Sequence, residues 1–187
     1  MATYPRMRRQ QLIREAEGYL DLVTVFDGRW SLEVAVRDRV AQRALDVLAR
    51  LEGADAERSE ALQLRGQALR VMERYADAVK PLRASLAIAP DDIATYLSLG
   101  WCYKRLGRVD LAIEALEEAL EVDSAQGILY YNLACYWSLA RNVELALMYL
   151  AQALEIEPAF RDLVADERDF DAVRAHPDFL TITSVVV

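Results

Sequence analysis

The sequence contains few of the residues that build catalytic or metal sites: one histidine and two cysteines among 187 residues. A single histidine, His176, cannot form a Ser-His-Asp set without partners, and no motif places such partners near it. The cysteines, Cys102 and Cys135, form neither a disulfide framework nor a metal-ligand spacing and are expected to be buried. No phosphate-binding glycine loop and no His-Glu-x-x-His motif is present. These absences predict a protein that is not an enzyme and that holds no metal or cofactor.

Long apolar runs and positive charge are also scarce. No stretch reaches the roughly 20 apolar residues of a membrane span, and no long apolar core follows the N-terminal arginines, so a secretory signal is not expected. The net charge of −8 argues against binding to a phosphate backbone. The cluster Arg6, Arg8, Arg9 and Arg14 lacks aromatic stacking residues, so we interpret it as a solvated helix turn, with nucleic acid or lipid as the alternative. We expect a cytoplasmic protein without nucleic-acid or membrane partners.

The strongest pattern is an ungapped repeat of 34 residues in a composition, 54% hydrophobic and 28% charged, typical of globular proteins. Small residues recur at two of its positions, and leucine recurs at a third. The three sets are Gly66, Gly100 and Ala134; Ala78, Ala112 and Ala146; and Leu82, Leu116 and Leu150. Small side chains allow two helices to approach closely, and large ones fill the space between successive pairs. The repeat therefore predicts stacked helix pairs.

The segment Tyr96-x-x-Leu99-Gly100-x-x-Tyr103, followed by Gly107 and Ala112, resembles the tetratricopeptide repeat. The resemblance implies an all-α, right-handed superhelix of stacked helix-turn-helix repeats. The expected copies are 59–92, 93–126 and 127–160. The expected helices are 55–71 and 76–87, 93–106 and 109–122, and 128–140 and 143–156. Gly107 is the expected turn in the middle copy, Arg141-Asn142 replaces it in the third, and Asp91-Asp92 is the expected N-cap of the second pair.

Residues 1–58 form the expected N-terminal helical hairpin, a degenerate first repeat. Apolar residues at three- and four-residue steps predict a helix from Met7 to about Val25. Asp27-Gly28 is a turn signal, and Ser31 is the expected N-cap of a second helix that ends at Gly53. In that helix Ala44 and Leu48 precede Ala78 and Leu82 by one repeat length.

Residues 161–187 are expected to cap the array. Phe160, Leu163 and Val164 predict a short helix, and the stretch from Asp169 to Leu180 resembles the tail that follows many bacterial tetratricopeptide arrays. The expected buried face of this tail is Phe170, Val173, Phe179 and Leu180, and His176 is interpreted as a helix-ending surface residue. Thr181 to Val187 has strand propensity and no helix signal. We expect it, with Val185–Val187, to lie in an apolar groove of its own capping helices or of a neighbouring molecule.

In tetratricopeptide arrays the first helix of each pair lines a concave groove that contacts extended peptides. The resemblance implies a groove lined by Gln63, Leu64, Gln67, Leu97, Ser98, Trp101, Lys104, Arg105, Ile128, Tyr131, Asn132 and Cys135. The basic clamp of members that bind chaperone C-termini is absent. An apolar strip takes its place, formed by Leu97, Trp101, Ile128 and Tyr131 with Lys104 and Arg105 at its edge. The alternatives are that the chain's own N-terminal hairpin or tail covers this strip, or that a second copy does.

The function predicted from these observations is a non-catalytic protein–protein interaction adaptor that binds an unknown partner peptide or protein in the groove. The alternative is a self-assembling scaffold, a homo-oligomer built through the groove or the C-terminal tail.

Overall fold

The computed structural model describes the backbone of residues 3–27 and 32–184 and the side chains of residues 6–24 and 32–184. These residues form helices joined by short turns, and none of them lies in a strand. The all-α prediction is therefore confirmed. The chain divides into two compact units, Met1–Cys102 and Tyr103–Val187, with the boundary inside one helix.

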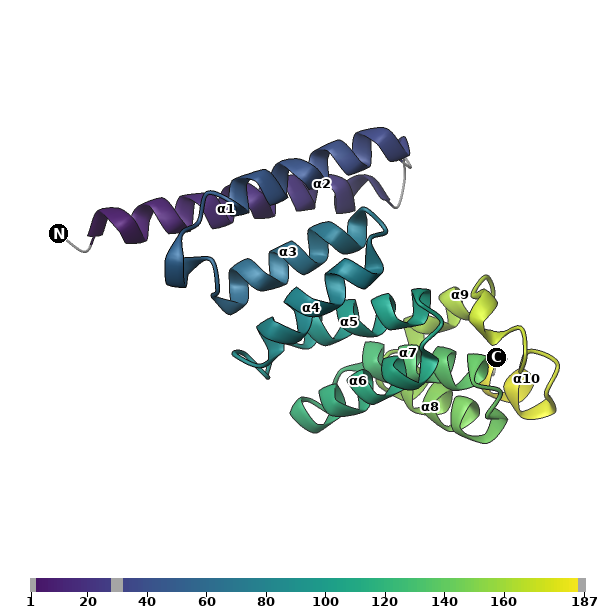
Figure 1. Cartoon of the computed structure of the whole chain (residues 1–187). Helices are drawn as coiled ribbons and strands as arrows, with labels where there is room; N and C mark the ends of the chain where they lie inside the picture. Colours follow the sequence, from purple (N-terminus) through teal and green to yellow (C-terminus); the bar gives the residue numbers. More distant parts are fainter. Residues whose placement is uncertain (1–2, 28–31, 185–187) are drawn as a thin grey trace. The chain divides into compact units, whose positions relative to one another are not determined.

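The first unit is built from two helix pairs and most of a further helix (Figure 1). Helices α1 (Thr3–Asp27) and α2 (Val34–Leu48) pack along each other, and both contact α3 (Ser59–Val71), which pairs with α4 (Tyr75–Leu86). A short 3-10 turn, η1 (Gly53–Asp55), links α2 to α3, and α5 (Ile93–Arg105) crosses the boundary. Apolar side chains from α1, α2 and α3 form one buried cluster, which includes Leu12, Ala16, Leu48 and Leu64.

The second unit contains α6 (Val109–Val122), α7 (Gly127–Leu139) and α8 (Val143–Ile156), with α7 packed against both of the others. The remaining elements are short: η2 (Pro158–Phe160), α9 (Arg161–Val164), η3 (Arg168–Phe170) and α10 (Pro177–Thr183). Element η3 lies against α7, and α10 lies against α8 (Figure 1). The C-terminal segment thus folds back onto the last helix pair.

The 34-residue period reappears in the backbone at the turns inside each pair. Glu73, Gly107 and Arg141 have φ of 58°, 73° and 60°, and they are spaced by one repeat length. A residue with positive φ ends an α-helix by exposing its last carbonyls to the amides that follow. Gly107 adopts this conformation without strain, whereas Glu73 and Arg141 carry a Cβ that disfavours it.

The predicted close-contact positions are buried. Ala78 and Ala112 are 0% exposed and Ala146 is 1% exposed, and Leu82, Leu116 and Leu150 are all 0% exposed. At Gly66 an added Cβ would lie 2.4 Å from Cγ of Leu82, so only glycine fits between α3 and α4 there. Both cysteines are buried thiols, as expected. The Asp92 carboxylate accepts from the amide of Thr95 at 3.3 Å, which confirms Asp92 as a cap of α5.

Two predictions in the N-terminal half differ from the structure. The first helix of the 59–92 pair begins at Ser59 rather than at Asp55. Gly53 takes a φ of 54°, and the Asp55 carboxylate holds Arg9 and Arg58, so this stretch closes as a 3-10 turn. The helix expected after Ser31 starts at Val34 and ends at Leu48, before Gly53. Ser31 and the Gly28 turn lie outside the described residues.

Three predictions for the tail are wrong. Leu180 is 58% exposed, because adjacent helical residues point about 100° apart and Phe179, at 2% exposure, takes the inward direction. Thr181–Thr183 belong to α10, since Pro177 at its first turn and the His176 cap start a helix that outweighs their strand propensity. His176 therefore begins a helix rather than ending one: its ring accepts from the Asp178 amide at 3.3 Å. Val185–Val187 lie outside the described residues.

Candidate functional site

The twelve predicted groove residues lie on α3, α5 and α7, the first helix of each pair. In the first unit, Leu64 is 4% exposed within the apolar cluster and Ser98 is 9% exposed, so both side chains contribute to packing. Gln63, Gln67 and Leu97 are half-buried. Trp101 is 38% exposed, which is unusual for the largest apolar side chain.

In the second unit the predicted residues separate into two groups. Arg105 is exposed, and Lys104, Ile128 and Asn132 are half-buried. Tyr131 and Cys135, one helical turn apart on α7, are 6% and 2% exposed. We call the surface formed by Tyr131 and Cys135 the α7 face. The chain's own C-terminal segment covers this face. Internal cover is one of the alternatives that the sequence left open for the apolar strip that includes Tyr131.

Aromatic rings make the apolar part of this cover. The Tyr131 ring lies 5.1 Å from the ring of Phe160 in η2 and 5.7 Å, edge-on at 86°, from that of Phe170 in η3. Phe170 in turn contacts Phe179 of α10, with 5.7 Å between ring centroids. Tilted and edge-on pairs are favourable arrangements of aromatic rings. Phe170 is 0% exposed, so its whole ring is enclosed by these contacts.

An ion pair makes the polar part. Lys104, at the end of α5, donates to the Asp169 carboxylate, and their side chains are only 16% and 13% exposed. Partial burial lowers the local dielectric constant and strengthens the attraction, although removing the charges from water opposes it.

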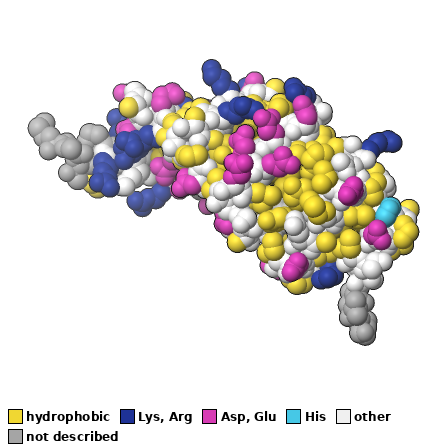
Figure 2. Space-filling model, turned by 90° about the horizontal axis from the view of Figure 1, so that it is seen from below, with side chains coloured by type: hydrophobic (Ala, Val, Ile, Leu, Met, Phe, Trp, Pro, Cys, Tyr) yellow, Lys and Arg dark blue, Asp and Glu magenta, His cyan; other side chains and the backbone are white. Residues whose placement is uncertain are grey.

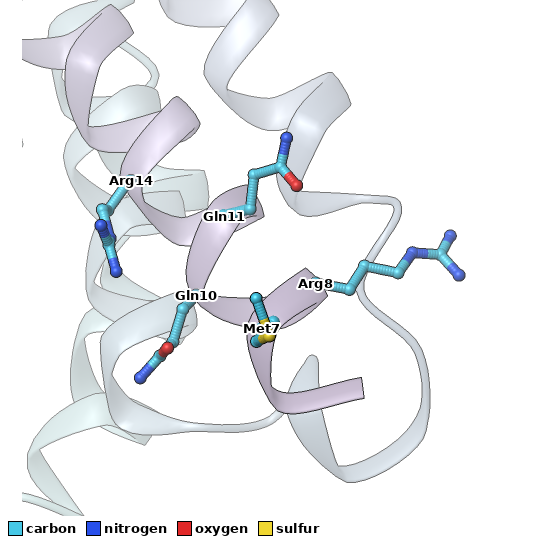
Figure 3. Close-up of a pocket in the computed structure, with 5 residues that line it drawn as sticks. All are labelled: Met7, Arg8, Gln10, Gln11 and Arg14. Carbon is cyan, nitrogen blue, oxygen red and sulfur yellow. The ribbon is translucent and has the colours of Figure 1, made fainter. Parts of the chain in front are cut away.

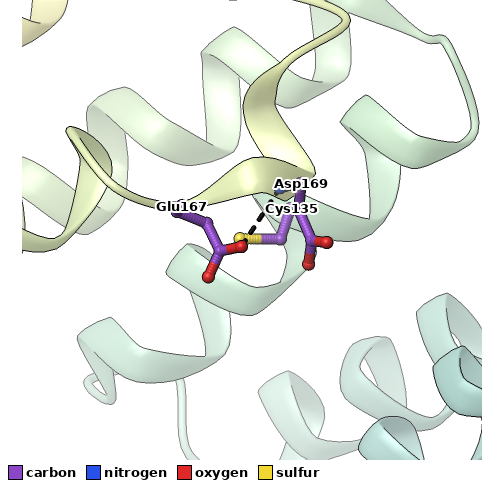
Figure 4. A group of neighbouring side chains, drawn as sticks. All are labelled: Cys135, Glu167 and Asp169. Atoms are coloured by element: carbon purple, nitrogen blue, oxygen red, sulfur yellow. Dashed lines mark hydrogen bonds between the residues drawn. The ribbon is translucent and has the colours of Figure 1, made fainter.

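Asp169 also belongs to a group with Cys135 and Glu167 whose possible ligand atoms lie within 4.8 Å of one another (Figure 4). Within this group the Asp169 amide donates to Oε1 of Glu167 at 3.1 Å. Thiolate and carboxylate ligands together suit a divalent ion such as zinc. Burial, with the nearby carboxylates adding to it, raises the pKa of Cys135 well above its usual value and keeps it a neutral thiol. The charge of Asp169 is already paired with Lys104. We therefore interpret this group as a packing contact between α7 and the C-terminal segment.

The Tyr131 hydroxyl is buried and has no hydrogen-bond partner among the described residues. Burial raises the pKa of Tyr131, and so do, in turn, Cys135, Glu167 and Asp169. The hydroxyl therefore remains a neutral donor. A buried donor without an acceptor is destabilising, because it has lost its hydrogen bonds to water.

The other surfaces of the described residues are weaker candidates for a binding site than the α7 face. Basic side chains gather at the N-terminal end of α1 (Figure 2). A depression there is lined only by exposed residues of α1, and in Figure 3 they project in different directions: Met7, Arg8, Gln10, Gln11 and Arg14. Side chains from one helix that do not converge make no specific pocket. Nearby, Arg9 contacts Asp55 at 3.0 Å, a structural role that the sequence pattern did not indicate.

No helix in the described ranges is both long enough and apolar enough to cross a membrane. The cytoplasmic location stays a prediction.

Comparison with known proteins agrees with this architecture. The family model of the tetratricopeptide repeat matches residues 93–125, the middle copy. The solved structure of MamA (AMB-1) is similar, with 20% identity and a TM-score of 0.65 over 94% of this chain and 92% of that one. Residues 93–125 thus match the tetratricopeptide repeat, and the chain shares the fold of solved tetratricopeptide-type helical arrays. A comparison with curated protein sequences found no match.

Two further structures share the fold and carry peptide sites. The Yersinia enterocolitica type III secretion chaperone SycD, in complex with a peptide of the translocator YopD, has 24% identity and a TM-score of 0.55. That match covers 62% of this chain and 89% of SycD. YrrB, described as having an unusual peptide-binding site, has 21% identity and a TM-score of 0.54, over 65% of this chain and 59% of YrrB. At these identities the likeness establishes the fold.

Proposed function

We propose that this chain is a non-catalytic adaptor that binds a protein partner through the surface side chains of its first helices. The observation that carries the proposal is Trp101 on α5, which is 38% exposed on the helix that the family comparison identifies as the first of its repeat. Tryptophan is enriched among the few residues that dominate binding energy at protein interfaces. Half-buried Leu97 on the same helix supplies further apolar area.

The chemistry of the described residues supports a role without catalysis. His176 is engaged as a helix cap, and burial raises the pKa of Cys102 to about 11, so neither is poised as a base or nucleophile. The peptide complex of SycD and the peptide-binding site of YrrB support peptide or protein ligands for this fold. The net charge of −8 favours a protein partner over nucleic acid or an anionic membrane.

Affinity capture from the host with Trp101→Ala tests the proposal. A partner anchored by Trp101 should bind the variant about 30-fold more weakly, as expected for a hot-spot residue worth about 2 kcal/mol. Met148→Ala on α8 is the matched control, because Met148 is also apolar and 43% exposed but lies on a second helix. A partner that binds both variants as well as the unaltered chain would overturn the assignment.

A homo-oligomer is the second candidate, and the exposed leucines of the C-terminal segment favour it. Leu163 and Leu180 are 53% and 58% exposed, and Figure 2 shows apolar side chains gathered around His176 in this unit. Light scattering should then give a dimer or larger species that Leu180→Glu converts to a monomer. A monomeric unaltered chain at micromolar concentration would exclude this candidate.

A further inference from the structure

The second compact unit contains both the α7 face and the segment that covers it. We propose that residues 167–170 act as a built-in competitor on the α7 face, and that this face binds partner peptides in which a carboxylate residue directly precedes an aromatic one. The inference rests on the proposed function, since it names the chemistry of a partner. It is carried by three features: an ion pair, an enclosed ring and an unsatisfied hydroxyl.

The ion pair specifies the carboxylate. Lys104 and Asp169 lie 65 positions apart in the sequence and meet at the rim of the α7 face with both side chains largely buried. A partner carboxylate that replaced Asp169 would meet the same half-buried ammonium group. A neutral residue there would not replace the charge that Asp169 offers to Lys104, and a basic residue would repel the ammonium group.

The enclosed ring specifies the residue that follows. Phe170, next to Asp169, places its ring edge-on against Tyr131 and beside Phe179, with no exposed surface. An aliphatic side chain would lose the edge-to-face contact, and a small one would leave a void. Asp169 and Phe170 together therefore define a two-residue motif, an acidic residue followed by an aromatic one.

The resident segment is an imperfect ligand, because it leaves the Tyr131 hydroxyl without an acceptor. A partner peptide that placed a carbonyl or carboxylate oxygen near this hydroxyl would gain a hydrogen bond that the tail does not make. A ligand that makes interactions which the segment lacks displaces it at a lower concentration. The unsatisfied hydroxyl supplies such an interaction.

The segment also keeps its shape largely through its own contacts. The Arg174 guanidinium donates to the carbonyls of Val164, Ala165 and Glu167, at 3.2, 3.1 and 2.6 Å. The amides of Phe170 and Asp171 donate to the carbonyls of Glu167 and Arg168. A turn built by neighbouring residues can be reproduced by a short peptide, which is why a peptide copy is a suitable probe.

The first test measures release of the tail in the full chain by the rate at which N-ethylmaleimide labels Cys135. Because the tail covers this thiol, Phe170→Ala and the shape-conserving Asp169→Asn should each raise the labelling rate at least tenfold. Cys102, which is 0% exposed in the first unit, is the internal control and should keep its rate. Asp171→Asn is the matched control, because the Asp171 side chain is 69% exposed and should leave Cys135 protected.

The second test supplies the motif in trans. A synthetic peptide with the sequence of residues 165–174 should restore protection of Cys135 in the Phe170→Ala chain. The same peptide carrying Asp169→Lys should not protect it. Lys104→Ala in the Phe170→Ala chain should weaken peptide binding at least tenfold, measured by fluorescence anisotropy of the labelled peptide.

Every outcome of the two tests either supports the proposal or overturns it. Unchanged Cys135 labelling in both tail variants would show a permanent cap and overturn the proposal. So would faster labelling that the peptide does not suppress. If Phe170→Ala also accelerates Cys102, it has unfolded the chain, and Asp169→Asn, with the peptide added to it, then carries both tests. None of these results depends on Trp101, so the adaptor proposal stands or falls separately.

Discussion

The first and third copies of the repeat place very different side chains at equivalent positions. Gln63 and Gln67 on α3 fall two repeat lengths before Tyr131 and Cys135 on α7. The glutamines are half-buried and polar, whereas Tyr131 and Cys135 are 6% and 2% exposed. Helix pairing is the same in both copies, since α3 packs on α4 as α7 packs on α8. The contacts inside a helix pair are therefore the same in both copies, whereas the side chains on the remaining face of the first helix differ.

This difference separates two kinds of position. Residues that hold a pair together, such as Leu82 and Leu150, are under the same packing constraint in each copy. Residues on the remaining face of the first helix depend on what covers that face. The following substitutions test the separation, beginning with the largest expected effect.

Leu82→Ala and Leu150→Ala should each lower the free energy of unfolding by about 2–5 kcal/mol, because both side chains are fully buried and leave a cavity. Urea denaturation measures the loss. Leu163→Ala, at a 53% exposed position, is the control and should change stability by less than about 0.5 kcal/mol. A loss below about 1 kcal/mol at either core leucine would show that the two pairs are not packed alike.

Gly66→Ala should destabilise by about 1–3 kcal/mol, since the new Cβ would overlap the buried Leu82 side chain. Gly18→Ala in α1 is the matched control. It meets nothing within 4 Å and should stabilise by up to about 1 kcal/mol through helix propensity. Thermal melting compares the two, and equal signs would contradict the close approach of α3 and α4.

Tyr131→Phe should raise the free energy of unfolding by about 1 kcal/mol, because it removes a buried hydroxyl that has no acceptor. At the equivalent position of the first copy, Gln63→Ala should have an effect below about 0.5 kcal/mol, since Gln63 is only half-buried. Chemical denaturation measures both changes. Clear destabilisation by Tyr131→Phe would mean that the hydroxyl has a partner in solution, and would weaken the inferred ligand acceptor.

Arg141→Gly should stabilise by about 0.5–1 kcal/mol, because glycine adopts the positive φ of this turn without strain. Glu73→Gly should gain less, since Glu73 also accepts from Arg37 at 2.7 Å and that surface pair would be lost. Differential melting temperatures measure the two gains. Destabilisation by Arg141→Gly would contradict the shared turn geometry.

Much of the fold was predictable because one face of every helix is fixed by its partner. The sequence predicts the first and last residues of α6 and α8 correctly. Apolar and small residues recur at helical spacing in both segments, and turn signals flank them. The buried alanines and leucines followed from the 34-residue spacing. Leu180 was misplaced because, in a helix of seven residues, periodicity alone does not decide which of two adjacent apolar side chains faces inward.

The candidate site was predictable only in part. The resemblance to the tetratricopeptide repeat implied that Tyr131 and Cys135 line the same helix face, but neither it nor the periodicity carries information about which later segment covers that face. The contact of Lys104 with Asp169 joins residues far apart in the sequence, and the role of Arg174 depends on three backbone carbonyls. Neither leaves a residue pattern by which the sequence alone could identify it.

The bracing of the tail by Arg174 has a consequence for its motion. The amides of Phe170, Asp171, Val173 and Arg174 donate to carbonyls between Glu167 and Phe170, within the span that the Arg174 guanidinium ties together. Breaking the contacts with α7 therefore leaves these hydrogen bonds in place, so the segment departs as a rigid body instead of fraying residue by residue. In native-state hydrogen exchange these four amides should therefore stay protected when the segment leaves α7, and should exchange together, with one opening free energy, only when the segment itself unfolds.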